Sequence, residues 1–92
     1  MRKIVITGLG VVSPFGCDLA QFWQKNIAGA NGIRRVSQFD ASPYPSQIAG
    51  EVPDFNVDSF LSKREQHRTD LYSQYAIAAA KLALKDSKLD FS

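Results

Sequence analysis

Residues 3–16 read KIVITGLGVVSPFG, a sequence that predicts a strand followed by a tight loop. The β-branched run ends at Gly8, which favours a short buried strand over residues 3–7. Gly10 interrupts any continuation of this strand, and Pro14 restricts the backbone of the residue before it. We therefore expect one buried strand and then a rigid loop.

A second informative stretch is YAIAAAKLAL, residues 75–84, which predicts a helix. Nine of these ten residues are apolar, Lys81 being the exception, and alanine is the strongest helix former. A helix that is apolar on nearly every side needs protein contacts on nearly every side. The rest of the sequence is too short to supply them. We therefore expect further chain or a partner subunit to cover this helix.

The segment between these two stretches predicts one helix and two shorter elements. Asp18 is a favourable N-cap residue for a helix that runs to Ala28, and Gly29 then ends the helix. Proline-rich chain follows, in which residues 47–52 resemble a short strand. A short helix is expected to begin at Asp58 or at the residue after it.

The composition is that of one small globular domain. The 92 residues are 45% hydrophobic and 22% charged, and the net charge of +2 gives no indication of a nucleic-acid partner. The sequence contains neither the run of about 18 apolar residues that a membrane span requires nor a secretory signal. The single cysteine, Cys17, rules out an internal disulfide and favours a reducing, cytoplasmic compartment.

Two glycines invite a cofactor-binding interpretation. Gly8 and Gly10 follow a predicted strand, as the glycines of dinucleotide-binding loops do. However, Ser13 stands where that motif requires a third glycine, and Pro14 follows where the helix should rise. A structural turn is the favoured interpretation, and the sequence predicts no cofactor.

Cys17 and His67 are the only pair available for thiol-based nucleophilic catalysis. A lone cysteine is more often a small apolar filler than a nucleophile. One cysteine and one histidine also cannot form a closed metal site without supporting carboxylates. The sequence therefore predicts no catalytic and no metal-binding residue within these 92 positions.

A basic segment precedes the alanine-rich helix and offers a candidate binding surface. On a helix its cations share one broad face; they are Lys63, Arg64, His67 and Arg68. Glu65 and Asp70 dilute the positive charge. Two interpretations remain open at this point, a solvated start of a helix or a docking patch for an acidic partner.

The motifs together resemble the β-ketoacyl-acyl-carrier-protein synthases, especially the type II enzymes of fatty acid synthesis. The resemblance begins with residues 3–16 and follows the family in order over essentially the whole chain. The later matching segments are Phe22-Trp23, Ala28-Gly29, Gly32-Ile33, residues 39–42, residues 48–52, Asp54-Phe55, and Asp70 with residues 74–76.

The resemblance implies an α/β fold of the thiolase-like kind, with residues 1–92 forming the N-terminal part of the first α/β half. It implies a homodimeric, cytoplasmic acyltransferase that performs a decarboxylating Claisen condensation with malonyl-acyl-carrier protein. The nucleophilic cysteine and the two catalytic histidines of the family lie beyond residue 92. Neither Cys17 nor His67 matches them, so the isolated chain is expected to be inactive.

The resemblance also gives the basic segment a partner. In the family this segment faces the acidic acyl carrier protein, which assigns docking to Lys63, Arg64, His67 and Arg68. Many relatives carry arginine or lysine at the position of His67. Because histidine is mostly neutral at pH 7, this difference predicts a weaker or pH-sensitive contact.

Three other interpretations fit these residues. A polyketide ketosynthase or a chain-length-factor relative would share the same opening motifs. A module of the same origin that binds an acidic carrier protein without catalysing a reaction belongs to a different functional class. A fragment of a nucleotide-binding Rossmann domain is the weakest of the three.

Overall fold

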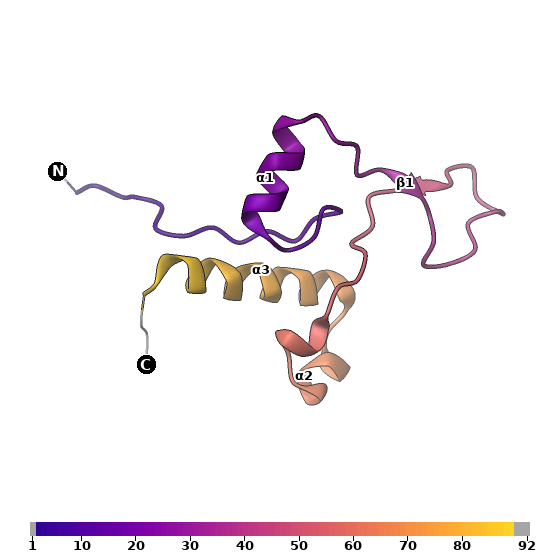
Figure 1. The fold of residues 1–92 in the computed structure, drawn as a ribbon. Coiled ribbons are helices and arrows are strands. Elements are labelled where there is room, and N and C mark those ends of the chain that lie inside the picture. Colours follow the sequence, from indigo (N-terminus) through magenta and orange to yellow (C-terminus); the bar gives the residue numbers. More distant parts are fainter. Residues whose placement is uncertain (1, 90–92) are drawn as a thin grey trace.

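Helix α3 (Leu71–Ser87) lies between the other α-helices of the structure (Figure 1). The computed structural model describes residues 2–89. The helix predicted over residues 75–84 is confirmed, although it begins four residues earlier and ends three residues later. Lys88 ends it in the left-handed conformation, with φ of 59°.

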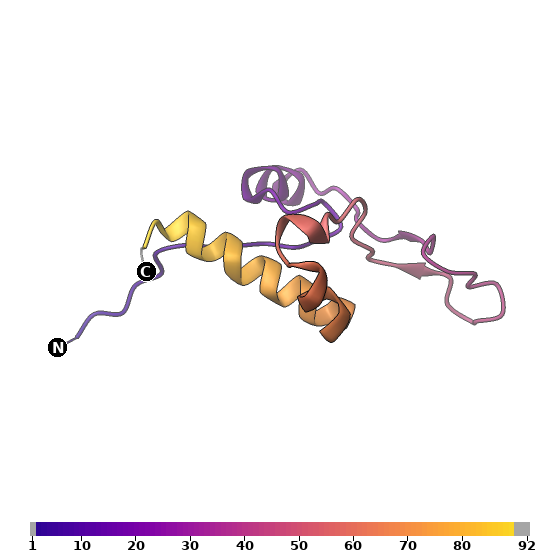
Figure 2. The same cartoon turned by 90° about the horizontal axis from the view of Figure 1, so that it is seen from below.

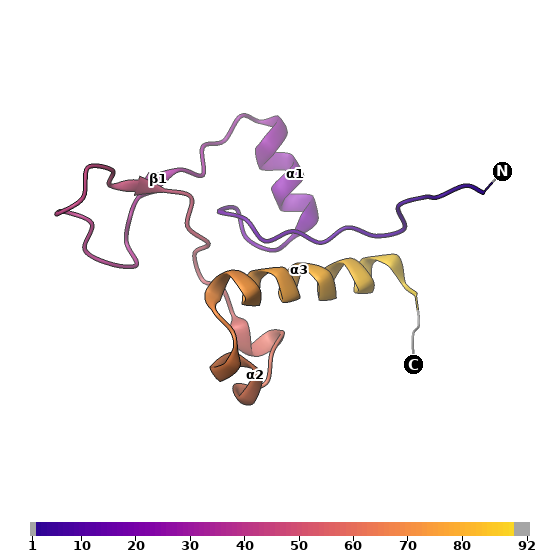
Figure 3. The ribbon, with the colours of Figure 1, turned by 180° about the vertical axis from the view of Figure 1, so that it is seen from behind.

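The prediction of a strand over residues 3–7 is wrong for the structure described. The two β-strands found within residues 2–89 lie elsewhere, and residues 3–7 extend outward past the end of α3 without a hydrogen-bonded neighbour among the described residues (Figures 1 and 3). Ile4 is 97% exposed and Ile6 is 81% exposed. A β-branched run forms a strand only when a ladder partner is present, and the described chain offers none.

Helix α1 (Leu19–Ile27) is confirmed, with Asp18 as its N-cap. The Asp18 carboxylate accepts hydrogen bonds from the backbone N–H groups of Ala20 at 2.9 Å and Gln21 at 3.3 Å. These bonds satisfy two of the donors that a helix leaves unpaired at its start. Beyond the helix, Gly29 adopts a positive φ of 74°, as expected for the residue that ends it.

We expect Asp18→Ala to lower the unfolding free energy by about 1 kcal/mol, because both capping bonds are lost. Asp18→Asn keeps an acceptor oxygen and should cost only a fraction of that. Denaturant unfolding of the protein that carries this segment measures both variants. Equal losses for the alanine and asparagine variants would contradict the capping role.

A two-stranded arm extends away from the helices. Strands β1 (Arg34–Arg35) and β2 (Ile48–Ala49) pair antiparallel, with Arg34 opposite Ala49. Figure 2 shows this arm and its long loop reaching beyond α3. The strand expected over residues 47–52 is therefore present but shorter than predicted.

A short 3-10 helix and helix α2 lie on the side of α3 opposite to α1 (Figures 1 and 3). The 3-10 helix, η1, spans Val57–Ser59, and α2 spans Lys63–Arg68. The expected short helix at Asp58 is confirmed only as this single 3-10 turn. Aromatic packing ties the region to α3, since the ring of Phe55 stands edge-on to Tyr75 with centroids 4.9 Å apart.

Few side chains are buried by this arrangement. The buried residues among those described are Ser13, Ala41, Val52, Leu61 and Ala78. The accessible surface is 7523 Å², whereas a compact protein of 10.2 kDa exposes about 5300 Å². The radius of gyration is 16.0 Å, against about 12 Å for a compact domain of this length. The chain thus carries roughly 2200 Å² of surface that a compact domain would bury.

Candidate functional site: a basic face on helix α2

The glycines of the opening motif pack against a helix and do not face a ligand. A Cβ atom on Gly8 would stand 2.5 Å from the amide nitrogen of Ser87, and one on Gly10 would stand 2.6 Å from that of Ala83. Only glycine allows the backbone to approach so closely. A dinucleotide loop instead directs its glycines at a pyrophosphate beside a helix N-terminus. The structural interpretation of Gly8 and Gly10 is therefore supported, although they form a crossing over α3 and not a tight turn.

The close approach of the N-terminal segment also explains why α3 is rich in alanine. Ala79 and Ala83 lie one helical turn apart beneath Gly10, and their neighbour Ala78 is fully buried. The crossing is fixed further by a hydrogen bond from the backbone N–H of Leu9 to the Asp86 carboxylate at 2.9 Å. Small side chains on the helix and glycines on the segment together allow backbone-to-backbone packing.

The structure does not bring Cys17 and His67 together. Cys17 lines a cavity of about 370 Å³ between the N-terminal segment, the start of α1 and the end of α3, whereas His67 lies on α2, on the other side of α3 (Figure 1). Partial burial raises the pKa of the Cys17 thiol, which lowers its thiolate fraction. This cysteine therefore lacks the base and the acidity that a nucleophile needs.

The four residues predicted to dock a carrier protein share helix α2. Successive residues of an α-helix are about 100° apart, so Lys63, Arg64, His67 and Arg68 fall within a sector of about 140°. All four are exposed. We call this sector the basic face of α2.

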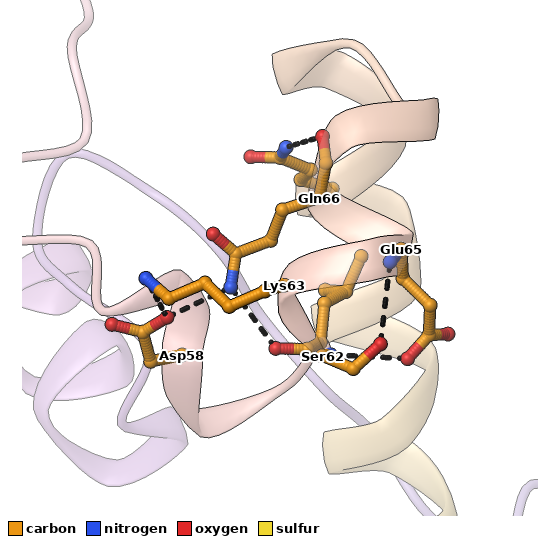
Figure 4. Close-up of polar contacts among 7 residues, drawn as sticks. Asp58, Ser62, Lys63, Glu65 and Gln66 are labelled. Atoms are coloured by element: carbon orange, nitrogen blue, oxygen red, sulfur yellow. Dashed lines mark hydrogen bonds and ion pairs between the residues drawn. The ribbon is translucent and has the colours of Figure 1, made fainter.

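Lys63 is held by the element before α2. Its ammonium group lies 3.1 Å from the Asp58 carboxylate, which also accepts a hydrogen bond from the Gln66 amide at 2.8 Å (Figure 4). The bond from Gln66 and the charge of Lys63 lower the pKa of Asp58. Because Lys63 is partly neutralised by this pair, the positive charge of the basic face depends mainly on Arg64 and Arg68.

Ser62 caps the start of helix α2. The Ser62 hydroxyl accepts a hydrogen bond from the N–H of Glu65 at 3.2 Å, and the Glu65 carboxylate accepts one from the N–H of Ser62 at 3.1 Å (Figure 4). The backbone bond from Ser62 lowers the pKa of Glu65. This reciprocal pair engages the Glu65 carboxylate, the one acidic side chain within α2, at the start of the helix. The spacing Ser-x-x-Glu would have predicted this start of the helix, and our sequence interpretation missed it.

The geometry of the basic face suits recognition of an anion. Within residues 2–89, the ion pairs and hydrogen bonds do not engage the side chains of Arg64, His67 or Arg68. The same residues contain neither a gathering of three potential metal ligands nor a helix long and apolar enough to span a bilayer. An exposed, unpaired cationic surface is the feature that this segment can contribute to function.

Comparison with known proteins defines the class of protein. The family model described as the N-terminal domain of beta-ketoacyl synthase matches residues 1–92. The chain therefore belongs to the beta-ketoacyl synthase family, and the resemblance inferred from the opening motifs is confirmed.

Within that family, two similar curated proteins share a name. The chain is 41% identical over 91 residues to 3-oxoacyl-[acyl-carrier-protein] synthase 2 of Staphylococcus aureus (strain COL). It is 43% identical over 91 residues to the protein of that name in Coxiella burnetii (strain RSA 493 / Nine Mile phase I). Each alignment includes 99% of this chain and 22% of the relative. The chain thus spans less than a quarter of the length of these relatives.

Solved structures confirm the fold class. An ishigamide ketosynthase/chain length factor matches 97% of this chain with a TM-score of 0.86 and 32% identity. A beta-ketoacyl synthase from Burkholderia phymatum STM815 matches the full chain with a TM-score of 0.78 and 27% identity. The matches cover 22% and 23% of those two chains. The segment therefore has the fold of the N-terminal part of a thiolase-like ketosynthase.

Proposed function

We propose that this chain is the N-terminal segment of a 3-oxoacyl-[acyl-carrier-protein] synthase. The proposed enzyme is a cytoplasmic, homodimeric acyltransferase that extends acyl chains in fatty acid biosynthesis by decarboxylating condensation with malonyl-acyl-carrier protein. The observation that carries the proposal is the similarity to synthases of that name along 99% of the chain. Because neither Cys17 nor His67 matches the catalytic residues of the family, the proposal places the catalytic cysteine and the two histidines in chain beyond residue 92.

The uncovered surface supports a role as part of a larger body. The apolar side chains at the N-terminus are exposed, and an apolar groove of about 720 Å³ lies between α1 and Asp86 of α3, beside Phe22 and Trp23. The excess of roughly 2200 Å² is the size of an obligate interface. We infer that the rest of the enzyme covers this surface, and that residues 3–7 pair with a strand of its sheet.

The basic face of α2 is the proposed docking site for the acyl carrier protein. Arg64, His67 and Arg68 are exposed and are not engaged by other described residues. An acidic partner would be attracted and oriented by these charges, which act mainly on the association rate. The remaining cation, Lys63, contributes less because it is paired with Asp58.

A chain-length-factor or polyketide ketosynthase role is the second candidate. It is favoured by the 0.86 TM-score to the ishigamide ketosynthase/chain length factor. A non-catalytic module that binds an acidic partner is a third, and the large uncovered surface argues against it because such a module would have to fold without further protein.

The function is tested by incubating the protein that carries this segment with an acyl donor and malonyl-acyl-carrier protein. We expect release of carbon dioxide together with formation of a 3-oxoacyl-carrier protein extended by two carbons. Carbon dioxide release without chain extension, or neither product, would contradict the proposal and would favour a chain-length-factor relative or a binding module.

Docking is tested by reversing two charges of the basic face. We expect Arg64→Glu with Arg68→Glu to weaken binding of an acyl carrier protein at least tenfold at low ionic strength, or about 1.4 kcal/mol. The difference should shrink as salt screens these exposed charges. Titration calorimetry at two salt concentrations measures both effects.

The matched control is Arg34→Glu with Arg35→Glu, which makes the same change in net charge on β1. It should alter affinity far less, because β1 lies on the extended arm away from α2 (Figure 1). Equal weakening by the two pairs would assign the effect to net charge and not to a docking face.

A further inference from the structure

Helix α2 is too short to fix its own orientation. It contains six residues, and isolated helices shorter than about 12 residues are marginal in water. The direction in which its basic face points must therefore be set by contacts with neighbouring elements. Two side chains of α3, Gln74 and Lys81, provide such contacts at the two ends of the segment that contains α2.

Gln74 holds the end of α2. Its side-chain amide donates hydrogen bonds to the backbone carbonyls of Gln66 and Thr69, each at 3.4 Å. Thr69 is the C-cap residue of α2, and the last carbonyls of a helix have no partner within that helix. A side chain of α3 thus satisfies carbonyls that α2 leaves unpaired.

Lys81 holds the chain that enters α2. Its ammonium group donates a hydrogen bond to the backbone carbonyl of Phe60, which ends η1 two residues before the N-cap Ser62. A charged donor makes a stronger hydrogen bond than a neutral one. Lys81 is also the one charged residue in the apolar run of residues 75–84, and this bond gives its charge a place in the fold.

Gln74 and Lys81 lie on the same side of α3. They are seven residues apart, which is almost two complete turns, so they are separated by about 10 Å along the helix axis. The chain from Phe60 to Thr69 is therefore attached to α3 at two separate points. Two points of attachment restrict rotation of α2 relative to α3, whereas one would leave it free to turn.

These attachments leave the arginines of the basic face exposed. At about 100° per residue, Gln66 falls outside the sector that Arg64 and Arg68 occupy. Gln66 is partly buried, and its amide donates to the Asp58 carboxylate at 2.8 Å and to the carbonyl of Leu61 at 3.1 Å (Figure 4). The contacts through Gln66 and through backbone carbonyls thus hold α2 without covering its arginines.

We propose that Gln74 and Lys81 are positioning residues for docking, which hold the segment of residues 60–69 so that the basic face meets the carrier protein in one orientation. This inference rests on the proposed function, because it requires the basic face to be the docking site. A surface that is already ordered loses less conformational entropy on binding, and its fixed charges orient the partner at encounter. Neither residue needs to touch the carrier protein or the reacting atoms.

The test replaces both donors with methionine in the protein that carries this segment. Methionine is unbranched and a good helix former, so α3 should stay helical. We expect Gln74→Met with Lys81→Met to raise Kd for an acyl carrier protein about fivefold at low ionic strength, and Lys81→Met alone to raise it about twofold. KM for malonyl-acyl-carrier protein should rise as well, with kcat at saturation unchanged. Lys81→Arg keeps a charged donor and should bind as the unaltered protein does.

Gln24→Met on α1 and Lys85→Met on α3 are the matched controls. They make the same chemical changes at exposed positions, and neither side chain forms a hydrogen bond or ion pair among residues 2–89. Each should change Kd less than twofold. Equal weakening by Lys85→Met and Lys81→Met would assign the effect to the lost charge and would contradict the positioning role.

A double-mutant cycle shows whether the two residues act through the basic face. Once Arg64→Glu with Arg68→Glu has reversed its charge, adding the methionine pair should weaken binding little further, because the orientation of the face no longer matters. Fully additive losses would mean that Gln74 and Lys81 contact the carrier protein by themselves. An equal fall in kcat would mean general damage to the fold. Either result would overturn the inference.

The two proposals fail in different ways. If Arg64→Glu with Arg68→Glu leaves binding unchanged at low salt, the basic face is not the docking site and both proposals are wrong. If that pair weakens binding while Gln74→Met with Lys81→Met binds as the unaltered protein does, docking stands and only the positioning role is overturned.

Discussion

Gly10→Ala is expected to destabilise the protein by about 3 kcal/mol, at the upper end of the cost of overpacking. The added methyl group would stand 2.6 Å from the amide nitrogen of Ala83 and still closer to the carbonyl oxygen of Ala79. Both atoms belong to the backbone of α3, which cannot rotate away as a side chain can. The N-terminal segment must therefore lift off the helix, and the Leu9 to Asp86 hydrogen bond is lost with it.

Gly50→Ala is the matched control for this substitution. A Cβ atom there would meet only side-chain atoms, Cδ1 of Ile33 at 3.2 Å and Cγ of Pro14 at 3.3 Å. We expect a cost below about 1 kcal/mol, offset in part by the lower entropy of the unfolded chain. Thermal unfolding and soluble yield of the two variants measure the difference. Equal stability of both would contradict the backbone packing of residues 8–10 on α3.

Local signals in the sequence predicted the helices well. Asp18 and Gly29 marked both ends of α1, and the alanine-rich run located α3. These features depend on a residue and its near neighbours, which are visible in a single sequence. The missed start of α2 was also a local signal, since Ser62 and Glu65 form a capping box.

Long-range features were predicted less well, because their partners lie far away in the chain. The β-branched residues 3–7 were expected to form a strand, yet a strand exists only where another strand pairs with it. The glycines at 8 and 10 read as a turn because their contacts, Ala79, Ala83 and Ser87, lie 69 to 79 positions later in the chain. Sequence spacing does not reveal such contacts.

The sequence indicated which residues share the basic face, but it did not indicate that one of them, Lys63, forms an ion pair. The four cations fall on one exposed helical face, as their spacing indicated. The ion pair between Lys63 and Asp58 was not anticipated, because Asp58 belongs to a different element whose geometry relative to α2 is set by the intervening turn. This pair leaves Arg64 and Arg68 as the arginines of the basic face that no described ion pair engages. Assignment of the carrier protein to this face stays a prediction.

Residues 1–92 expressed alone are expected to lack a cooperative unfolding transition and any condensing activity. Only four hydrophobic residues among those described are buried, and Ala78 is the only one with no exposed surface. Burial on this scale does not offset the conformational entropy of ordering the chain. Helix α3 should persist only in part, because most of the stability of a helix within a protein comes from the packing of its apolar side chains against other elements.

Calorimetric and circular-dichroism melting of residues 1–92 tests most directly the central claim that this segment depends on further protein for its fold. The account predicts a broad loss of helical signal with temperature, without a heat-absorption peak. A sharp, reversible, monomeric transition, with an enthalpy near the roughly 60 kcal/mol expected of a complete domain of this length, would contradict it.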